Sequence, residues 1–387
     1  MVNVMSEDIK VLEEWLKQAK DLICEISSKA KKNKVHSIFT ISSTAKVPEK
    51  SYPFLTPLRQ TFHSVIAGAV VFSQTQGILL CSRIDGLVDE VFVDAEKKIG
   101  MSFGLNEEVI RHFNLSLPDS SFCRNYVELG NLSHPCSLHI KKSKFQEFKS
   151  NDLAVEAVCH FLSNRFRVLS GKKIAIIGSG NIGFKIALKL VESGCTVDIV
   201  RRDISEGMLM ANAIIIIKPA STLAVAHFNP NPIQASLYCD ALIGSSNGIP
   251  VITWEMVQSM KPDGIILDVG KGTICEDAIE KALNSDVEII RCDVSSAIDG
   301  FITATRRSRL IMENETGRNQ IEEGIFIVSG GYMGHMDDIV VDNYSSPTRV
   351  IGVADGCGDF KKELTEGNRR DIEALNDRID KLKKLEN

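Results

Sequence analysis

Residues 172–202 read KKIAIIGSGNIGFKIALKLVESGCTVDIVRR, and this stretch decides the fold. A short apolar strand, 174–177, leads directly into a GxGxxG series of glycines. An amphipathic helix follows, and a second strand, 196–200, comes at the distance expected for a strand–turn–helix–strand unit. The pattern predicts a Rossmann domain with a doubly wound parallel sheet.

Each glycine of the series has its own physical reason. Gly178 permits the tight turn, Gly180 lets a pyrophosphate come close to the backbone, and Gly183 lets the helix pack on the strand. Unpaired N–H groups at the helix N-terminus would face the phosphates. The alternatives are a related unit that binds another nucleotide or has lost binding. We expect a dinucleotide site at Gly178, Ser179, Gly180, Asn181, Ile182 and Gly183.

The end of the second strand predicts which dinucleotide binds. Arg201 and Arg202 suit the 2′-phosphate of NADP, because guanidinium groups hold a phosphate well. The alternative is that both arginines are solvated and that Asp203 binds the ribose of NAD. NADP is the predicted cofactor, and NAD is the alternative.

Strand and helix patterns alternate from residue 172 to 294, as in a parallel sheet. Before them, the sequence predicts another α/β domain. It begins with an amphipathic helix near Ser6, and strands are predicted at the apolar runs 37–42, 65–72, 77–81 and 90–94. We therefore expect an N-terminal α/β substrate domain at 1–150, the Rossmann domain at 151–300 and a C-terminal segment at 301–387. The last helix carries Ile372, Leu375, Ile379 and Leu382 at the 3-4-3 spacing of a coiled-coil seam, but for barely two heptads, so docking on either domain of its own chain is favoured over pairing with a second chain.

Composition narrows the class of protein. The 387 residues carry a net charge of -5, with cations scattered among anions, so neither nucleic acid nor an anionic membrane is an expected partner. Ten cysteines form no CxxC pair, and no signal or membrane-spanning segment is visible. We expect a soluble cytoplasmic protein without a metal site that acts on a small molecule as a homo-oligomer, with a dimer as one form.

A second block, 239–274, reads CDALIGSSNGIPVITWEMVQSMKPDGIILDVGKGTI. Here the chain resembles the Rossmann dehydrogenases that share the layout of methylenetetrahydrofolate dehydrogenases, adenosylhomocysteine hydrolases and D-2-hydroxyacid or alanine dehydrogenases. The resemblance spans about 151–294 and implies a cofactor, not a substrate. It implies that two loops line the cofactor, with Ser245, Asn247 and Gly248 after one strand and Asp268 and Gly270 after the next.

Hydride transfer needs a nearby proton donor or acceptor. Lys271 follows a strand end of the Rossmann sheet, and His335 lies in the glycine-rich SGGYMGHMDD. The polar, proline-broken segment 43–64 is expected to be a loop that supplies His63 for catalysis, with Arg59 and Lys46 for substrate binding. His134, Cys136 and His139 match no standard zinc spacing, so we expect no metal there.

The predicted function is an NADP-dependent dehydrogenase or reductase for a small polar metabolite bound between the domains. One alternative is a hydrolase or lyase that uses tightly bound NAD as an internal redox catalyst. Another is a non-catalytic protein that senses nucleotides.

Overall fold

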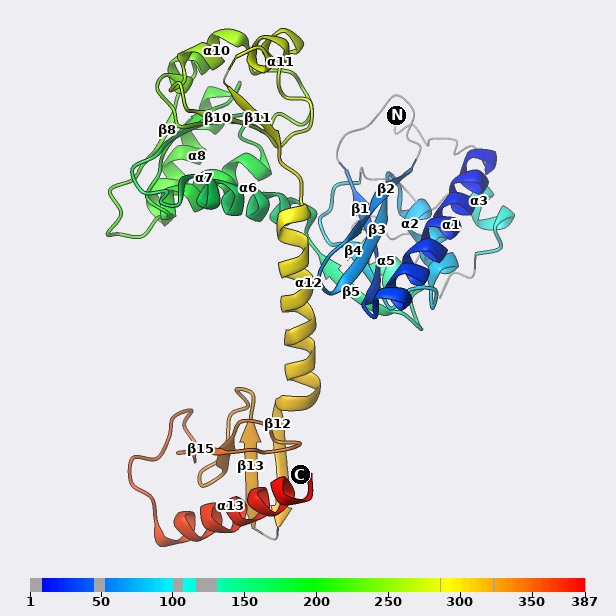
Figure 1. The fold of residues 1–387 in the computed structure, drawn as a ribbon, viewed down its shortest axis with the longest axis vertical. Helices are drawn as coiled ribbons and strands as arrows, with labels where there is room; N and C mark the ends of the chain where they lie inside the picture. Colours follow the sequence, from blue (N-terminus) through cyan, green and yellow to red (C-terminus); the bar gives the residue numbers. More distant parts are fainter. Residues whose placement is uncertain are drawn as a thin grey trace. The chain divides into compact units, whose positions relative to one another are not determined.

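The computed structural model describes residues 9–44, 53–99, 107–115, 131–285, 287–322 and 324–386. The chain divides into two compact units, Met1–Asp299 and Gly300–Asn387. The first unit holds two sheets and the second unit holds one (Figure 1). In the part of the chain that the structure describes, no helix combines the length and apolarity needed to cross a bilayer.

The first sheet has the strand order β2-β3-β1-β4-β5. Strands β3, β1, β4 and β5 run parallel, and β2 pairs antiparallel with β3 at the edge. The chain moves from β1 outward to β3 and then crosses to β4 on the other side, so the winding reverses between β1 and β4. The elements are α1 (Ile9–Asn33), β1 (His36–Ser43), β2 (Phe54–Gln60), β3 (Ser64–Val71), α2 (Gln74–Ile84), β4 (Glu90–Asp94), α3 (Glu107–His112), α5 (Ser133–Ser137) and β5 (Lys144–Phe148).

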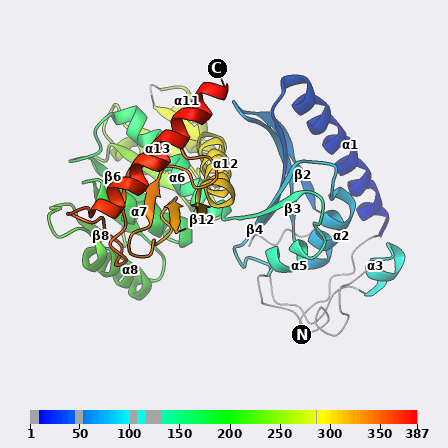
Figure 2. The ribbon, with the colours of Figure 1, turned by 90° about the horizontal axis from the view of Figure 1, so that it is seen from below.

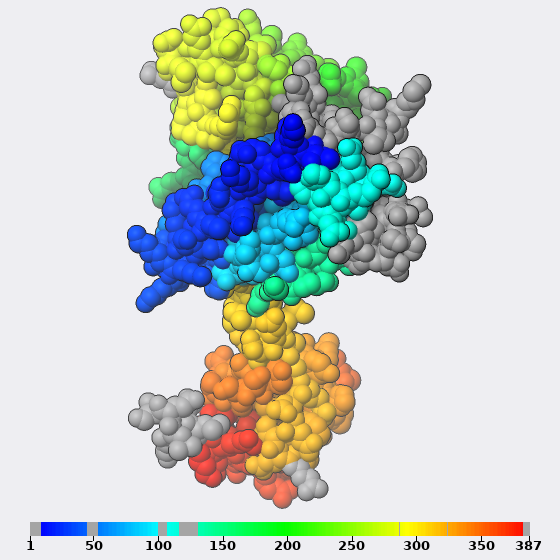
Figure 3. Space-filling model, turned by 90° about the vertical axis from the view of Figure 1, so that its right-hand side faces the viewer, coloured from blue at the N-terminus to red at the C-terminus, as the bar shows by residue number. Residues whose placement is uncertain are grey.

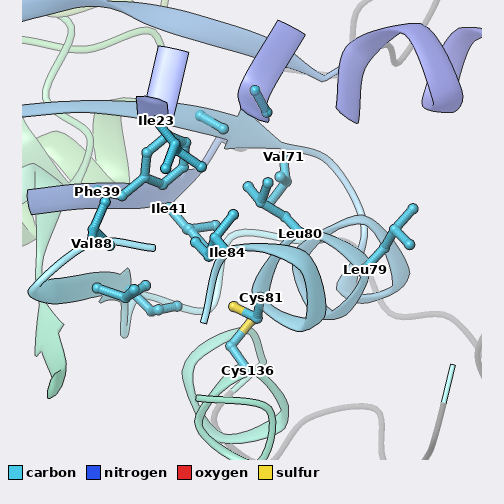
Figure 4. Close-up of a cluster of buried hydrophobic side chains, with 14 of the residues drawn as sticks. Ile23, Phe39, Ile41, Val71, Leu79, Leu80, Cys81, Ile84, Val88 and Cys136 are labelled. Carbon is cyan, nitrogen blue, oxygen red and sulfur yellow. The ribbon is translucent and has the colours of Figure 1, made fainter. Parts of the chain in front are cut away.

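One face of this sheet packs against helices. Alternate residues of the strands, such as Phe39 and Ile41, point to α1, α2 and α5, because successive side chains of a strand lie on opposite faces. Helix α1 lies along the sheet (Figure 2), and its outer side forms a band across the surface (Figure 3). Cys81 of α2 and Cys136 of α5 meet sulfur to sulfur inside this core (Figure 4). Burial, followed by the neighbouring Cys136, raises the pKa of the Cys81 thiol.

Two expectations for this region are wrong. The apolar run 77–81 is not a strand but the middle of α2, which Ser73 caps by accepting a hydrogen bond from the N–H of Gln76. Every residue from Gln74 to Cys81 is buried, so no exposed side reveals the helical period. The expected loop 43–64 contains β2, where the edge position and a bulge between Thr56 and Arg59 accommodate a proline.

The second sheet has six parallel strands in the order β11-β10-β9-β6-β7-β8. This is the doubly wound order of a Rossmann fold, with the reversal between β6 and β9. The predicted α/β class and Rossmann layout are confirmed. The elements are α6 (Ser150–Phe166), β6 (Lys173–Ile177), α7 (Asn181–Glu192), β7 (Thr196–Val200), α8 (Ile204–Ile217), β8 (Ala226–Phe228), α9 (Pro232–Ser236), β9 (Ala241–Gly244), α10 (Trp254–Ser259), β10 (Ile265–Asp268), α11 (Glu276–Leu283) and β11 (Glu288–Arg291).

The remaining elements begin with α12 (Ser295–Leu310), which continues into the π-helical turn η1 (Ile311–Glu315). The four-stranded sheet has the order β12-β13-β14-β15. Helix α13 (Glu366–Glu386) buries Leu375 and Ile379 with Ile327, Ile339 and Val341 of the sheet. The last helix therefore packs on the sheet of its own chain. The strands are β12 (Gly317–Glu322), β13 (Ile325–Ser329), β14 (Ile339–Val341) and β15 (Val350–Val353).

Candidate functional site

The glycine series forms the turn between β6 and α7. Gly178 has φ +93°, a left-handed conformation that favours glycine. A β-carbon on Gly178 would lie 2.9 Å from the Cα of Ser246, and one on Gly183 would lie 2.6 Å from the carbonyl oxygen of Gly178. Packing inside the protein therefore requires glycine at both positions.

Gly180 differs from these two glycines. A β-carbon built there would have no protein atom within 4 Å, and its φ of −84° is open to any residue. Gly180 precedes α7 as its N-cap and has no side chain to accept a hydrogen bond from the first turn. The cradle thus leaves backbone N–H groups without a side-chain cap at a helix N-terminus, and a pyrophosphate fits this arrangement.

The loop after β9 closes over the glycine turn. The hydroxyl of Ser245 donates a hydrogen bond to the carbonyl oxygen of Gly178, and Ser246 contacts the same glycine. Asn247 and Gly248 both have positive φ, 55° and 76°, at the tip of this loop. Both loops emerge where the winding of the sheet reverses, which is the position at which doubly wound sheets bind ligands.

The two arginines after β7 have different surroundings. The Arg201 guanidinium donates to the carbonyl oxygen of Ser179 and pairs with Glu206, while its buried Nε has no partner among the described residues. Arg202 is exposed. Asp203 caps α8, because its Oδ1 accepts a hydrogen bond from the N–H of Glu206 at 2.9 Å. An unpartnered donor beside the phosphate turn fits an anionic or ribose oxygen.

Asp268 holds the turn after β10. Its carboxylate accepts hydrogen bonds from the N–H of Gly272 at 2.8 Å and from the Thr273 hydroxyl at 2.8 Å. Burial works to raise the pKa of Asp268, but these hydrogen bonds and the charge of Arg291 outweigh it and hold the pKa below its usual value. A β-carbon on Gly270 would lie 3.1 Å from the backbone nitrogen of Asn247, so the loops after β9 and β10 are in contact.

Asp293 pairs with Arg59 and lies within reach of the charge of Lys271. Arg59, on β2, pairs with Asp293 at 2.8 Å between its Nη2 and the Oδ2. Burial of Asp293 opposes ionisation, whereas hydrogen bonds from Ser295 and the charges of Arg59 and Lys271 lower its pKa. The structure thus brings two of the predicted residues together, at the carboxyl end of β11.

The remaining predicted catalytic and substrate residues are His63, His335 and Lys46. His63 is exposed in the turn between β2 and β3. His335 belongs to the second unit, where its backbone N–H donates to Asp338. Lys46 lies outside the described residues. Their roles stay predictions.

A polar cluster that the sequence did not predict lies at the winding reversal of the first sheet. The Lys98 ammonium pairs with Asp94 at 3.1 Å and with Glu96 at 2.7 Å. The Asp94 carboxylate, fully buried at the end of β4, also accepts hydrogen bonds from Ser43 at the end of β1 and from Ser150. One signal was available in DAEK, 94–97, which follows an apolar strand, since carboxyl ends of parallel strands are where ligands bind.

Hydrogen bonds join this cluster to the glycine turn. Glu96 accepts from the backbone N–H of Asn151 at 2.9 Å, and the Asn151 amide donates to the Asn181 side chain at 3.4 Å. Asn181 is the first residue of α7, directly after Gly180. A chain of polar contacts through Glu96, Asn151 and Asn181 therefore connects Lys98 to the turn that is predicted to bind phosphate.

Metal chemistry gains no support from the residues that can be described. No group of three or more His, Cys, Asp or Glu side chains gathers among them. Cys136 is buried against Cys81. Burial, followed by the charge of Lys141, lowers the pKa of His139.

Comparisons with known proteins give likenesses of fold. No family model and no curated protein match the sequence. Dipicolinate synthase from Bacillus halodurans is 13% identical over 70% of this chain and 79% of that one, with a TM-score of 0.34. Dipicolinate synthase from Bacillus subtilis is 12% identical over 71% and 95%, with a TM-score of 0.31. Glutamyl-tRNA reductase from Methanopyrus kandleri is 17% identical over 41% and 39%, with a TM-score of 0.32.

Proposed function

We propose that the chain is an NADP-dependent dehydrogenase or reductase for a small polar metabolite. The observation that supports this proposal most directly is Gly180. No contact inside the protein requires a glycine there, and no side chain caps the start of α7. A ligand that must approach the backbone would explain why glycine occurs at this position. The exposed guanidinium of Arg202 supports NADP over NAD.

Several residues of the chain would then have separate roles in binding the cofactor. A bound nicotinamide dinucleotide supplies or accepts the hydride. The α7 N-terminus would bind the pyrophosphate, while Ser245, Asn247, Gly248 and Gly270 would shape the wall of the cofactor site. Asp268 would position this wall through its turn, since its own oxygens are engaged there.

The substrate would bind between the first sheet and the Rossmann sheet, both in the first unit. Lys271 beside Asp293 is the proposed proton donor, and Arg59 would hold the substrate. Lys98 adds a second cation near the glycine turn. Lys271 and Lys98 each follow the carboxyl end of a parallel strand, where doubly wound sheets place their ligands, whereas Arg59 lies on the antiparallel edge strand β2.

The test is a calorimetric titration of NADPH into the parent and into Gly180→Ala. A methyl group would hold the pyrophosphate away from at least one charged hydrogen bond, about 1.5–3 kcal/mol, so affinity should fall roughly tenfold to a hundredfold. Thermal unfolding should be unchanged, because the β-carbon meets open space.

Gly300→Ala is the matched control, since a β-carbon there also contacts no protein atom. It should leave NADPH affinity unchanged. Equal affinity of the parent and Gly180→Ala would remove the assignment of this turn. Absence of NADPH and NADH binding by the parent would end the proposed function.

A further inference from the structure

Helix α8 is apolar on nearly every side. It reads ISEGMLMANAIIII, with Glu206 as its single charged residue, and Arg201 pairs with that glutamate. Only Gly207, Ala211 and Ile214 are buried. A helix that is hydrophobic all round is normally buried all round, so its composition is unexplained by the packing of this chain's first unit.

The exposed part of α8 continues into the next loop. Lys218, directly after the helix, donates to the carbonyl oxygens of Thr222 and Ala224, and this fixes the intervening Leu223 beside the end of α8. We call the exposed set the α8 face. Its large apolar members are Ile204, Met208, Leu209, Ile215, Ile216, Ile217 and Leu223.

The size of the α8 face matches a protein interface. Its seven side chains leave between 37% and 96% of their surfaces exposed. Together this is on the order of 800 Å², the area that each partner buries in a standard-size complex. Scattered exposed apolar residues need no explanation, but large apolar side chains gathered on one helix and the loop after it, with the exposed Ser205 and Asn212 among them, mark an interaction site.

We propose that the α8 face is the interface through which two copies of this chain form a symmetric dimer. A two-fold axis brings the same surface of each copy together, so the surface must complement itself. A face without a free charge meets this condition, because no like charges are forced together. The edge strand β8 lies directly under α8, with the Phe228 ring against Gly207, so the face is backed by a rigid sheet.

Sedimentation velocity on the full chain tests the proposal. The parent should sediment at twice the chain mass of 42.6 kDa at micromolar concentration. Leu209→Glu/Ile216→Glu and Leu209→Lys/Ile216→Lys place two like charges at i and i+7 on the face. Each double variant alone should raise the dimer dissociation constant at least a hundredfold, roughly the cost of placing several like charges in one interface.

Sedimentation of a mixture of the two double variants is the decisive experiment. Opposite charges on the same face should restore a heterodimer if the two copies meet through that face. Leu283→Glu, on α11 of the same domain and also exposed, is the matched control and should leave the dimer intact. Circular dichroism and NADPH titration of each variant check folding and the cofactor site separately.

Three outcomes overturn the proposal. A monomeric parent excludes the self-association. A dimer that survives both double variants places the interface elsewhere. A mixture that stays monomeric means that the α8 face does not meet its own copy. Dimerisation without NADPH binding would leave this inference standing and end only the proposed function.

Discussion

The two adjacent arginines at the end of β7 have different surroundings. Arg201 folds back over the glycine turn, held by the Ser179 carbonyl and by Glu206, so it shapes the turn as well as carrying charge. Arg202 points to solvent. Asp203, the alternative ligand for a ribose, is already used as a helix cap. The residue pattern predicted the choice between NADP and NAD, but the pattern could not show that the aspartate is engaged.

Arg202→Ala should weaken NADP binding and leave NAD binding unchanged. Loss of one charged hydrogen bond costs about 1.5–3 kcal/mol, or roughly tenfold to a hundredfold in affinity. Arg201→Asp should reverse the preference, because it removes a cation and supplies a carboxylate for the ribose hydroxyl. Titrations of both dinucleotides measure this. Arg165→Ala is the control, because Arg165 is an exposed arginine paired with Glu288. Equal losses of NAD and NADP affinity in Arg202→Ala would show that the protein does not recognise the 2′-phosphate.

Among the elements, the turn after β10 depends on a single buried carboxylate. Lys271 and Gly272 both have positive φ, 58° and 96°, which costs free energy in the lysine. Asp268 compensates by binding the turn at Gly272 and Thr273. A rigid turn keeps Lys271 beside Asp293, so this element links the stability of the sheet to the proposed proton donor.

Asp268→Asn should lower the free energy of unfolding by about 1–3 kcal/mol at neutral pH, the cost of disturbing buried hydrogen bonds. The folded-state pKa of Asp268 is lowered, so its contribution is present above the usual carboxyl pKa of about 4 and is lost as pH falls through the lower folded value. Urea unfolding of both proteins at pH about 7 and about 3 should show the difference shrinking in acid.

Asp277→Asn is the control for this series, since its ion pair with Lys281 is exposed at both ends. It should change stability by no more than about 0.5 kcal/mol at either pH. A pH-independent loss in Asp268→Asn would mean that the carboxylate acts by shape and not by charge.

The sequence predicted elements best where amphipathic periodicity or a glycine motif was present. Strand β7 was predicted at 196–200, where the structure has it, and β6 was predicted at 174–177 and begins one residue earlier. The glycine motif also predicted the turn geometry, because each glycine has a separate steric reason. Helix α2 was missed since all its sides are buried near its start, and β2 was missed since its proline and bulge resemble a loop.

Across the whole molecule, the candidate site combines parts that are far apart in the sequence. Arg59 and Asp293 are 234 residues apart, and Lys98 reaches Ser150 across a sheet. Pair contacts of this kind leave no periodic signal, so the sequence alone could nominate Arg59 and Lys271 but not their shared carboxylate. Lys98 was missed because a lysine in a polar stretch usually marks a solvated surface.

Leu375→Ala should destabilise the second unit by about 2–5 kcal/mol, since it removes a buried side chain from the contact between α13 and its sheet. Because α13 docks on its own chain, the loss should be the same at low and high protein concentration. Thermal unfolding monitored at two concentrations measures this. Glu373→Ala, two residues earlier and exposed, is the control. A loss that disappears at high concentration would indicate pairing between chains.

The strand order of the first sheet has a consequence for synthesis. β1 lies at the centre of the sheet, yet both of its neighbours, β3 and β4, come later in the chain. A ribosome therefore delivers a strand that is almost wholly buried in the finished fold before either hydrogen-bonding partner exists. α1 is made just before β1 and packs against it in the finished fold. This helix can cover the apolar side of the nascent strand while the rest of the domain is translated.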